Sequence, residues 1–346
     1  MRRLGSVLSA TLVALILTAG PAAACGGLIG PNGAVNLLRT TTLAGYSAGV
    51  EHYITAFQFA GGGGSFGSIT PLPGVPTSVV KGGDWTLQRL IRETAPVQDR
   101  QFRFGSEAPA PSAEEILKVR IDALDLTVLR GGSGQIGQWA KDHGFRLPPD
   151  APEVLDFYAR RSQIFLAAAF DADAAAERGQ QLGDGTPVHI TIPTDDPWVP
   201  LRILALGKGG TERVEADVFL LTERRPSLMP TPIGRNGLEL SHFAPATDSL
   251  LDDLRSDRDM EWVPTRGWLT QIRIDAAAEQ LKFDLAIDAS GLGQPSRVDA
   301  GFDLPGVVEA TTESPGLGLA IAFVALGVAV IGGLMSTGGR RRATIA

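Results

Sequence analysis

The stretch from Glu51 to Phe59, EHYITAFQF, decides the fold class that we predict. Its large side chains recur at alternate positions, which places Tyr53, Phe57 and Phe59 on one side of an extended chain. Successive side chains of a strand point to opposite faces, so a period of two is typical of a half-buried β-strand. The segment therefore predicts a strand.

The rest of the chain predicts more strands than helices. Further strands are expected at 188–192, 201–206, 214–221, 268–274 and 281–287, at 163–170, and at 116–129 as one long or two short strands, with a glycine hairpin at 207–210. Short helices are expected at 85–93, capped by Asp84, and at 133–143, 152–160 and 249–254. Because strands and helices do not alternate strictly, the pattern predicts an α+β fold with mixed or antiparallel sheets.

Residues 1–24 have the pattern of a secretory signal peptide. A basic start is followed by an apolar run from Val7 to Leu17 and by small residues that end in three alanines. An uncleaved anchor is the alternative, but a spanning helix needs about 20 apolar residues. The one cysteine, Cys25, comes next. We expect ordinary cleavage after Ala24, with lipidation of Cys25 as the alternative.

The segment from Leu317 to Met335 contains no charged residue and no proline. At 1.5 Å per residue it makes about 28 Å of helix, close to the thickness of the hydrocarbon core. Three arginines follow at 340–342, and positive residues stay on the cytoplasmic side. We therefore expect one transmembrane helix at 316–337, a cytoplasmic tail at 338–346 and an extracytoplasmic body.

Small residues recur every fourth position in this helix, at Ala325, Ala329 and Gly333. Such spacing lets two transmembrane helices approach closely and predicts a homodimer contact. The alternative, which we favour, is that alanine and glycine are simply abundant in this chain.

The region between the hydrophobic ends is acidic. Five of the 31 Lys and Arg residues lie in the signal peptide and the tail, which leaves 26 against 38 Asp and Glu, a net charge of −12. This charge argues against nucleic acid as a partner. We divide the region into a main α+β part at 25–225, a second strand-rich part at 226–288 and a membrane-proximal stalk at 289–315.

Two segments carry candidate catalytic groups. Ser65 lies in a G-x-S-x-G pattern, with His52 as a candidate base, although a flexible glycine loop is the interpretation that we favour because no helix follows. Asp195 and Asp196 stand beside Trp198, an arrangement that suits a cation or a sugar ring. The favoured alternative is a turn in which Trp198 packs inward and Arg202 pairs with an acid.

No cofactor and no metal are expected. The G-x-G-x-x-G pattern at 132–137 is taken as a helix cap, because the flanking sequence is not a run of strand–helix repeats. The four histidines show no spacing on a shared helix face. The acidic stretch at 250–262 is interpreted as a solvated helix face.

Four segments together resemble a known family. They are Ala24–Gly27, Tyr53–Pro76 with its PLPGVP ending, His143–Arg161 (HGFRLPPDAPEVLDFYARR) and Ile192–Leu204 (IPTDDPWVPLRIL). They resemble the bacterial envelope family catalogued as domain of unknown function 2330. The resemblance implies an extracytoplasmic, membrane-anchored protein and brings no activity, cofactor or catalytic residue.

The sequence favours a non-enzymatic role in which the outer body binds or scaffolds other envelope components. The alternative is an extracytoplasmic hydrolase that uses Ser65 or the Asp195/Asp196 pair. We therefore leave open whether the protein is an enzyme and favour the reading that it is not.

Overall fold

The computed structural model describes residues 27–31, 33–34, 37–59, 66–95, 117–171 and 186–305. These ranges all belong to one compact unit that ends at Pro305. The predicted signal peptide, Cys25, Ser65 and the predicted transmembrane helix with its small-residue pattern lie outside the described residues. Within the described part, no helix is both long enough and apolar enough to cross a membrane.

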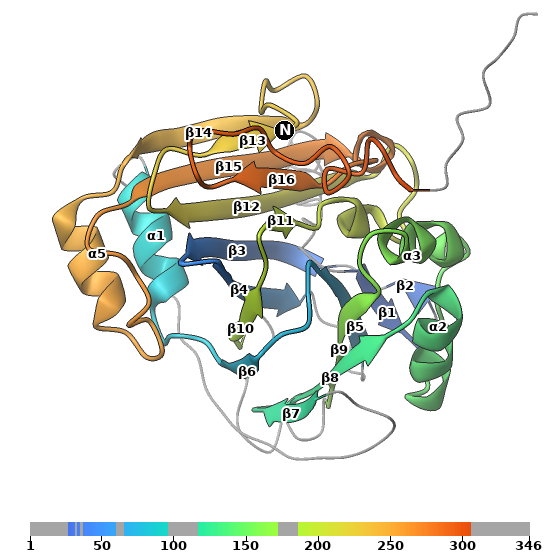
Figure 1. Cartoon of the computed structure of the whole chain (residues 1–346). Helices are drawn as coiled ribbons and strands as arrows, with labels where there is room; N and C mark the ends of the chain where they lie inside the picture. The colour runs from blue at the N-terminus through green and yellow to red at the C-terminus, as the bar shows by residue number, and fades with distance from the viewer. Residues whose placement is uncertain are drawn as a thin grey trace, which may run out of the picture. The chain divides into compact units, whose positions relative to one another are not determined.

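A seven-stranded mixed sheet forms the centre of this unit (Figure 1). Its order is β14 (Leu238–Pro245), β15 (Trp268–Ala277), β12 (Arg213–Thr222), β3 (Leu37–Ser47), β4 (Val50–Phe59), β10 (Val188–Pro193) and β6 (Ser78–Lys81). The pair β3 and β12 is parallel, and the other neighbours are antiparallel. The strand predicted at 51–59 is β4, and it lies inside the sheet between β3 and β10.

Two further sheets complete the strand-rich fold, and both are antiparallel. The six-stranded sheet has the order β2 (Gly33–Ala34), β1 (Gly27–Gly30), β5 (Phe66–Leu72), β9 (Ile164–Phe170), β8 (Leu124–Arg130) and β7 (Leu117–Ile121). The three-stranded sheet has the order β11 (Trp198–Val199), β16 (Leu285–Asp288) and β13 (Ser227–Met229). The predicted α+β class with mixed and antiparallel sheets is confirmed.

Helices cover the sheets in two pairs. Helices α1 (Thr86–Thr94) and α5 (Asp248–Arg255) lie together on the left in Figure 1, and α2 (Ser133–Asp142) and α3 (Ala151–Ala159) lie together on the right. Leucines of α1 and α5 share one buried cluster with residues of β3, β4 and β12. A larger cluster joins the other face of the seven-stranded sheet to the six-stranded sheet and to α2 and α3.

Strand β4 shows how the alternation in the sequence is used. Tyr53 belongs to the larger cluster, whereas its neighbour Ile54 belongs to the cluster under α1 and α5. Both residues are buried, because both faces of the central sheet are covered. His52 therefore shares the helix-covered face with Ile54, and Glu51 shares the opposite face with Tyr53.

The prediction of a strand at 201–206 is wrong. Residues Arg202–Ala205 form a short 3₁₀ helix, η1, because the backbone N–H groups before and within it bind buried side chains instead of a neighbouring strand. The hairpin predicted at 207–210 is also wrong, since the N–H of Gly207 donates to the carboxylate of Asp150. The strand predicted at 281–287 shrinks to β16, and a second short 3₁₀ helix, η2 (Ala278–Gln280), precedes it.

The start of α1 is capped from a distance. Asp84, the predicted cap, pairs with Arg258. The carboxylate of Asp257 instead accepts the backbone N–H groups of Asp84 and Trp85 and the hydroxyl of Thr86, at 3.0, 3.1 and 2.7 Å. The interpretation of residues 250–262 as one solvated helix face is therefore wrong, because α5 ends at Arg255 and Asp257 is buried.

Strands on both sides of residue 226, where the sequence suggests a second part, lie in the same seven-stranded sheet. The described portion of the predicted stalk packs against the body. Ala300 is fully buried, and its carbonyl accepts a hydrogen bond from the N–H of Asp284.

Candidate functional site

Two histidines meet on the helix-covered face of the seven-stranded sheet. His52 of β4 and His189 of β10 occupy diagonal positions on adjacent antiparallel strands, since His189 stands opposite Ile54 and His52 opposite Thr191. Nδ1 of His52 lies 3.0 Å from Nε2 of His189, so one ring donates a hydrogen bond to the other. The other nitrogen of His189, Nδ1, is buried and meets no hydrogen-bond partner within the described residues.

Trp262 covers this histidine pair. Its ring stacks on His52 with the ring centres 4.0 Å apart and the planes 5° from parallel. The tryptophan fits because β3 carries Gly45 beside His52, and a Cβ at that position would lie only 2.0 Å from the Trp262 ring. A side chain at position 45 would therefore displace the tryptophan.

Burial keeps both imidazoles neutral. Removal from water and, to a smaller extent, the neighbouring His189 together lower the pKa of His52 to about 3. Burial also lowers the pKa of His189 to about 4, although Asp259 and Glu261 act in the opposite direction. Perturbed histidines mark candidate functional sites, because they change charge when their surroundings change.

The predicted carboxylate pair lies on the surface. Asp195 and Asp196 are both exposed, and the pKa of Asp196 is raised by partial burial and by the charges of Asp299 and Asp195. Trp198 is buried, so its ring is not available to a sugar. Arg202 pairs with Glu153, in agreement with the turn interpretation.

Glu51 is a fully buried acid close to this turn. Its carboxyl makes no hydrogen bond of normal geometry within the described part of the chain, although the backbone N–H of Trp198 lies near enough to favour ionisation in part. Burial outweighs that contact and raises the pKa of Glu51 to about 8. Glu51 is therefore largely protonated at neutral pH.

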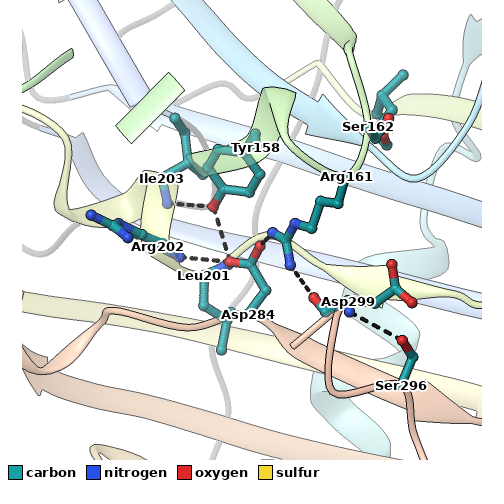
Figure 2. A network of polar contacts seen from close by, with 10 residues as sticks. Tyr158, Arg161, Ser162, Leu201, Arg202, Ile203, Asp284, Ser296 and Asp299 are labelled. Carbon is teal, nitrogen blue, oxygen red and sulfur yellow. Dashed lines mark hydrogen bonds and ion pairs between the residues drawn. The ribbon is translucent and has the colours of Figure 1, made fainter. Parts of the chain in front are cut away.

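A second polar cluster surrounds the buried carboxylate of Asp284 (Figure 2). One oxygen accepts the hydroxyl of Tyr158 at 2.9 Å and the backbone N–H groups of Leu201 and Arg202 at 2.7 and 2.9 Å. The other oxygen pairs with Arg161, whose guanidinium also donates to the carbonyl of Asp299. Tyr158 in turn accepts the N–H of Ile203 at 2.8 Å.

Aromatic rings enclose the guanidinium of Arg161 within this cluster. Its central carbon lies 4.5 Å from the ring centre of Trp198, 4.6 Å from Phe157 and 5.0 Å from Tyr158. Burial lowers the pKa of Arg161 to about 10, which leaves it charged at neutral pH. The pairing of Asp284 with Arg161 and three N–H or O–H donors is the arrangement that a buried charge requires, and it clamps α3, η1 and β16 together.

Of the residues predicted to carry chemistry, His52 alone lies in one of these clusters; Asp195 and Asp196 lie at the surface and Ser65 is not described. Sequence reasoning missed the partners of His52, which are His189 and Trp262. The alternation of the predicted strand at 188–192 identifies the face of His189 within its strand, but nothing in the sequence specifies which strand pairs with it. Within the described ranges, no group of three or more His, Cys, Asp or Glu side chains is arranged to hold a metal ion.

The fold and these clusters define an α+β protein built on a mixed sheet and fastened by buried polar contacts. A family model described as "Uncharacterized protein conserved in bacteria (DUF2330)" matches residues 19–227, which is more than half of the chain. The chain belongs to this family. Two of the segments that carry the resemblance, His143–Arg161 and Ile192–Leu204, meet at Asp284, which lies beyond the matched residues.

No curated protein matches this chain. Among solved structures, the crystal structure of baculovirus P35 is similar at 9% sequence identity with a TM-score of 0.38, and the alignment covers 74% of this chain and 92% of that one. A likeness this distant carries no argument about function.

Proposed function

We propose that this chain is a membrane-tethered protein of the bacterial cell envelope whose extracytoplasmic body binds or scaffolds other envelope components without catalysing a reaction. The tether rests on the sequence: a signal peptide pattern at 1–24, an uncharged apolar segment at Leu317–Met335 and three arginines after it. Membership of an uncharacterised bacterial family is compatible with this role and assigns no activity.

The use of the buried carboxylates supports a structural role rather than a catalytic one. Asp284 fastens three elements, Asp257 caps α1 and Asp122 binds Lys81 and Thr186. These carboxylates hold together segments that are far apart in the sequence. We infer a scaffolding role from this use of the carboxylates, because acids committed to structural contacts are not available for catalysis.

Site-specific photocrosslinking in intact cells tests the binding role. A photoreactive residue replaces Ile233 or Leu292, the two most exposed large apolar side chains in the described part, at 63% and 85% exposure. The proposal expects crosslinks to one recurring envelope protein from at least one position. The matched control is Ile91 on α1, a less exposed apolar residue, and crosslinks of equal yield and identity from all three positions would indicate random collision.

The hydrolase alternative has a direct test of its own. A fluorophosphonate probe labels an activated serine nucleophile covalently. The proposal expects no difference in labelling between the full chain and its Ser65→Ala variant. Probe labelling of the full chain that disappears in Ser65→Ala would overturn the non-enzymatic role. Hydrolytic activity of the full chain that disappears in Asp195→Asn or Asp196→Asn would overturn it as well.

A further inference from the structure

The loop between α5 and β15, residues 256–267, lies across the face of the sheet that carries the histidine pair; we call it the strap. Its Asp257 caps α1, its Met260 and Val263 are buried in the cluster beneath α1 and α5, and its Trp262 stacks on His52. The strap therefore packs in the same buried cluster as apolar side chains of the sheet, among them Leu43 and Ile54.

The closed position of the strap requires neutral histidines. A protonated imidazole carries an N–H on both ring nitrogens. With both rings charged, the protons on Nδ1 of His52 and Nε2 of His189 would point at each other across 3.0 Å. The second N–H of His189 would be buried without an acceptor among the described residues. Opening the strap to water relieves both problems.

We propose that residues 256–267 form an acid-released strap, held closed at neutral pH by the contact of Trp262 with the His52–His189 pair and opened when both imidazoles take up protons. Opening uncovers the apolar face beneath and withdraws the Asp257 cap from α1. The strap lies within the body, so its release does not depend on whether the chain is tethered to a membrane.

The charged groups around the pair oppose release only in part, because burial outweighs them and the pKa of His189 stays lowered. From the strap itself, Asp259 and Glu261 favour the protonated form of His189, and Arg258 is paired with Asp84 near the start of α1. Beta strand β6 places Val80 opposite His189, while Lys81 points to the other face and pairs with Asp122. On β3 the neighbour is Gly45, which carries no charge.

The difference in proton binding between the closed and open forms determines how strongly the opening equilibrium of the strap changes with pH. A water-exposed histidine has a pKa of about 6.5, whereas the closed pair has pKa values of about 4 and about 3. The open form therefore binds more protons throughout this interval, and acid favours opening. Two such groups raise the opening equilibrium about 500-fold between pH 7 and pH 5, and one group raises it about 25-fold.

Hydrogen exchange of the full chain in detergent, read by mass spectrometry between pH 5 and pH 7 and corrected for intrinsic rates, tests the proposal. Carboxylates with ordinary pKa values stay ionised over this range. Peptides from the strap should show the 500-fold increase, and peptides from the paired strands β12 and β15 should not. Equal increases in both would mean global unfolding and would overturn the proposal.

Two variants and a control sharpen the test. His52→Phe keeps a flat ring against Trp262, and His189→Gln keeps a donor toward His52; each should reduce the increase to about 25-fold, and the double variant should abolish it. The control is His143→Gln, because His143 also stacks on a tryptophan, Trp139, at 4.5 Å. A 500-fold increase that survives in the double variant, or one that disappears in the control, would contradict the strap mechanism.

Discussion

The hydroxyl of Tyr158 donates a hydrogen bond of 2.9 Å to the carboxylate of Asp284, a residue 126 positions later in the chain. Both side chains are fully buried. Tyr158 lies within the residues matched by the family model, and Asp284 lies beyond them. The contact thus joins the family-matched region to the following segment.

Asp284→Ala is expected to destabilise the body by about 3–5 kcal/mol, because it leaves Arg161 buried without its partner. Urea denaturation followed by tryptophan fluorescence measures the change. The control is Asp303→Ala, which breaks an exposed pair with Arg297 and should leave the urea midpoint almost unchanged. A loss below 1 kcal/mol in Asp284→Ala would show that the cluster does not hold these elements together.

A chain that ends at residue 227 is expected not to fold, although it contains the whole family match. It loses β15, which pairs with β12 along ten consecutive residues, and it loses the carboxylate of Asp284. Circular dichroism and the cooperativity of urea unfolding provide the measurement. A chain that ends at Pro305 serves as the control and should unfold cooperatively; equal cooperativity in both would place the folding unit within the family match.

Stability should depend on pH through Glu51 in a direction opposite to that of the histidines. Burial raises the pKa of Glu51 from 4.5 to about 8, so its contribution is complete below pH 4.5 and is lost as pH rises to 8. The pKa values of His52 and His189 are lowered, so their contribution is lost as pH falls from 6.5 toward 4. Together these groups place the stability maximum near pH 6.5.

Glu51→Gln isolates the alkaline part of this profile. The amide has no proton to lose, so the decline between pH 6.5 and pH 8, at most about 1.4 kcal/mol per pH unit, should disappear. Urea midpoints measured in steps of half a pH unit provide the comparison with the wild-type chain. An unchanged alkaline decline in the variant would mean that Glu51 is not the group responsible.

Gly45→Ala should open the strap at neutral pH, because the new methyl group would overlap the ring of Trp262. The expected cost is about 1–3 kcal/mol, as for other insertions into a packed core. Hydrogen exchange of the strap, residues 256–267, at pH 7 should rise relative to that of strands β12 and β15. Gly134→Ala is the control, since a Cβ at that position meets no atom within 4 Å.

Local sequence patterns are enough to predict those helices and strands whose conformation is set by the residues within them. The alternation in β4 and the apolar run of β9 are enough to predict strands, and Ile136, Trp139 and Ala140 pack inward from α2 as helical spacing requires. Gly144 ends that helix region with a φ of +75°, a conformation that glycine adopts without strain.

Contacts between distant segments account for the elements that sequence reasoning missed. Residues 201–206 have the composition of a strand, yet Asp284 and Tyr158 bind their N–H groups and impose a 3₁₀ turn. Asp84 precedes α1 as a cap should, yet Asp257 does the capping from 171 residues beyond Thr86. The pairing of His52 with His189 likewise depends on sheet register, which no local pattern specifies.

We propose a tethered protein with its body outside the cell membrane, and reporter fusions measure this orientation. A reporter that is active only in the cytoplasm is fused after Ala346, and a second one that is active only after export is inserted after Pro305. Both reporters are expected to be active, and the chain should stay in the membrane fraction after alkaline extraction. Export activity after Ala346, or a chain released by alkaline extraction, would contradict this proposal.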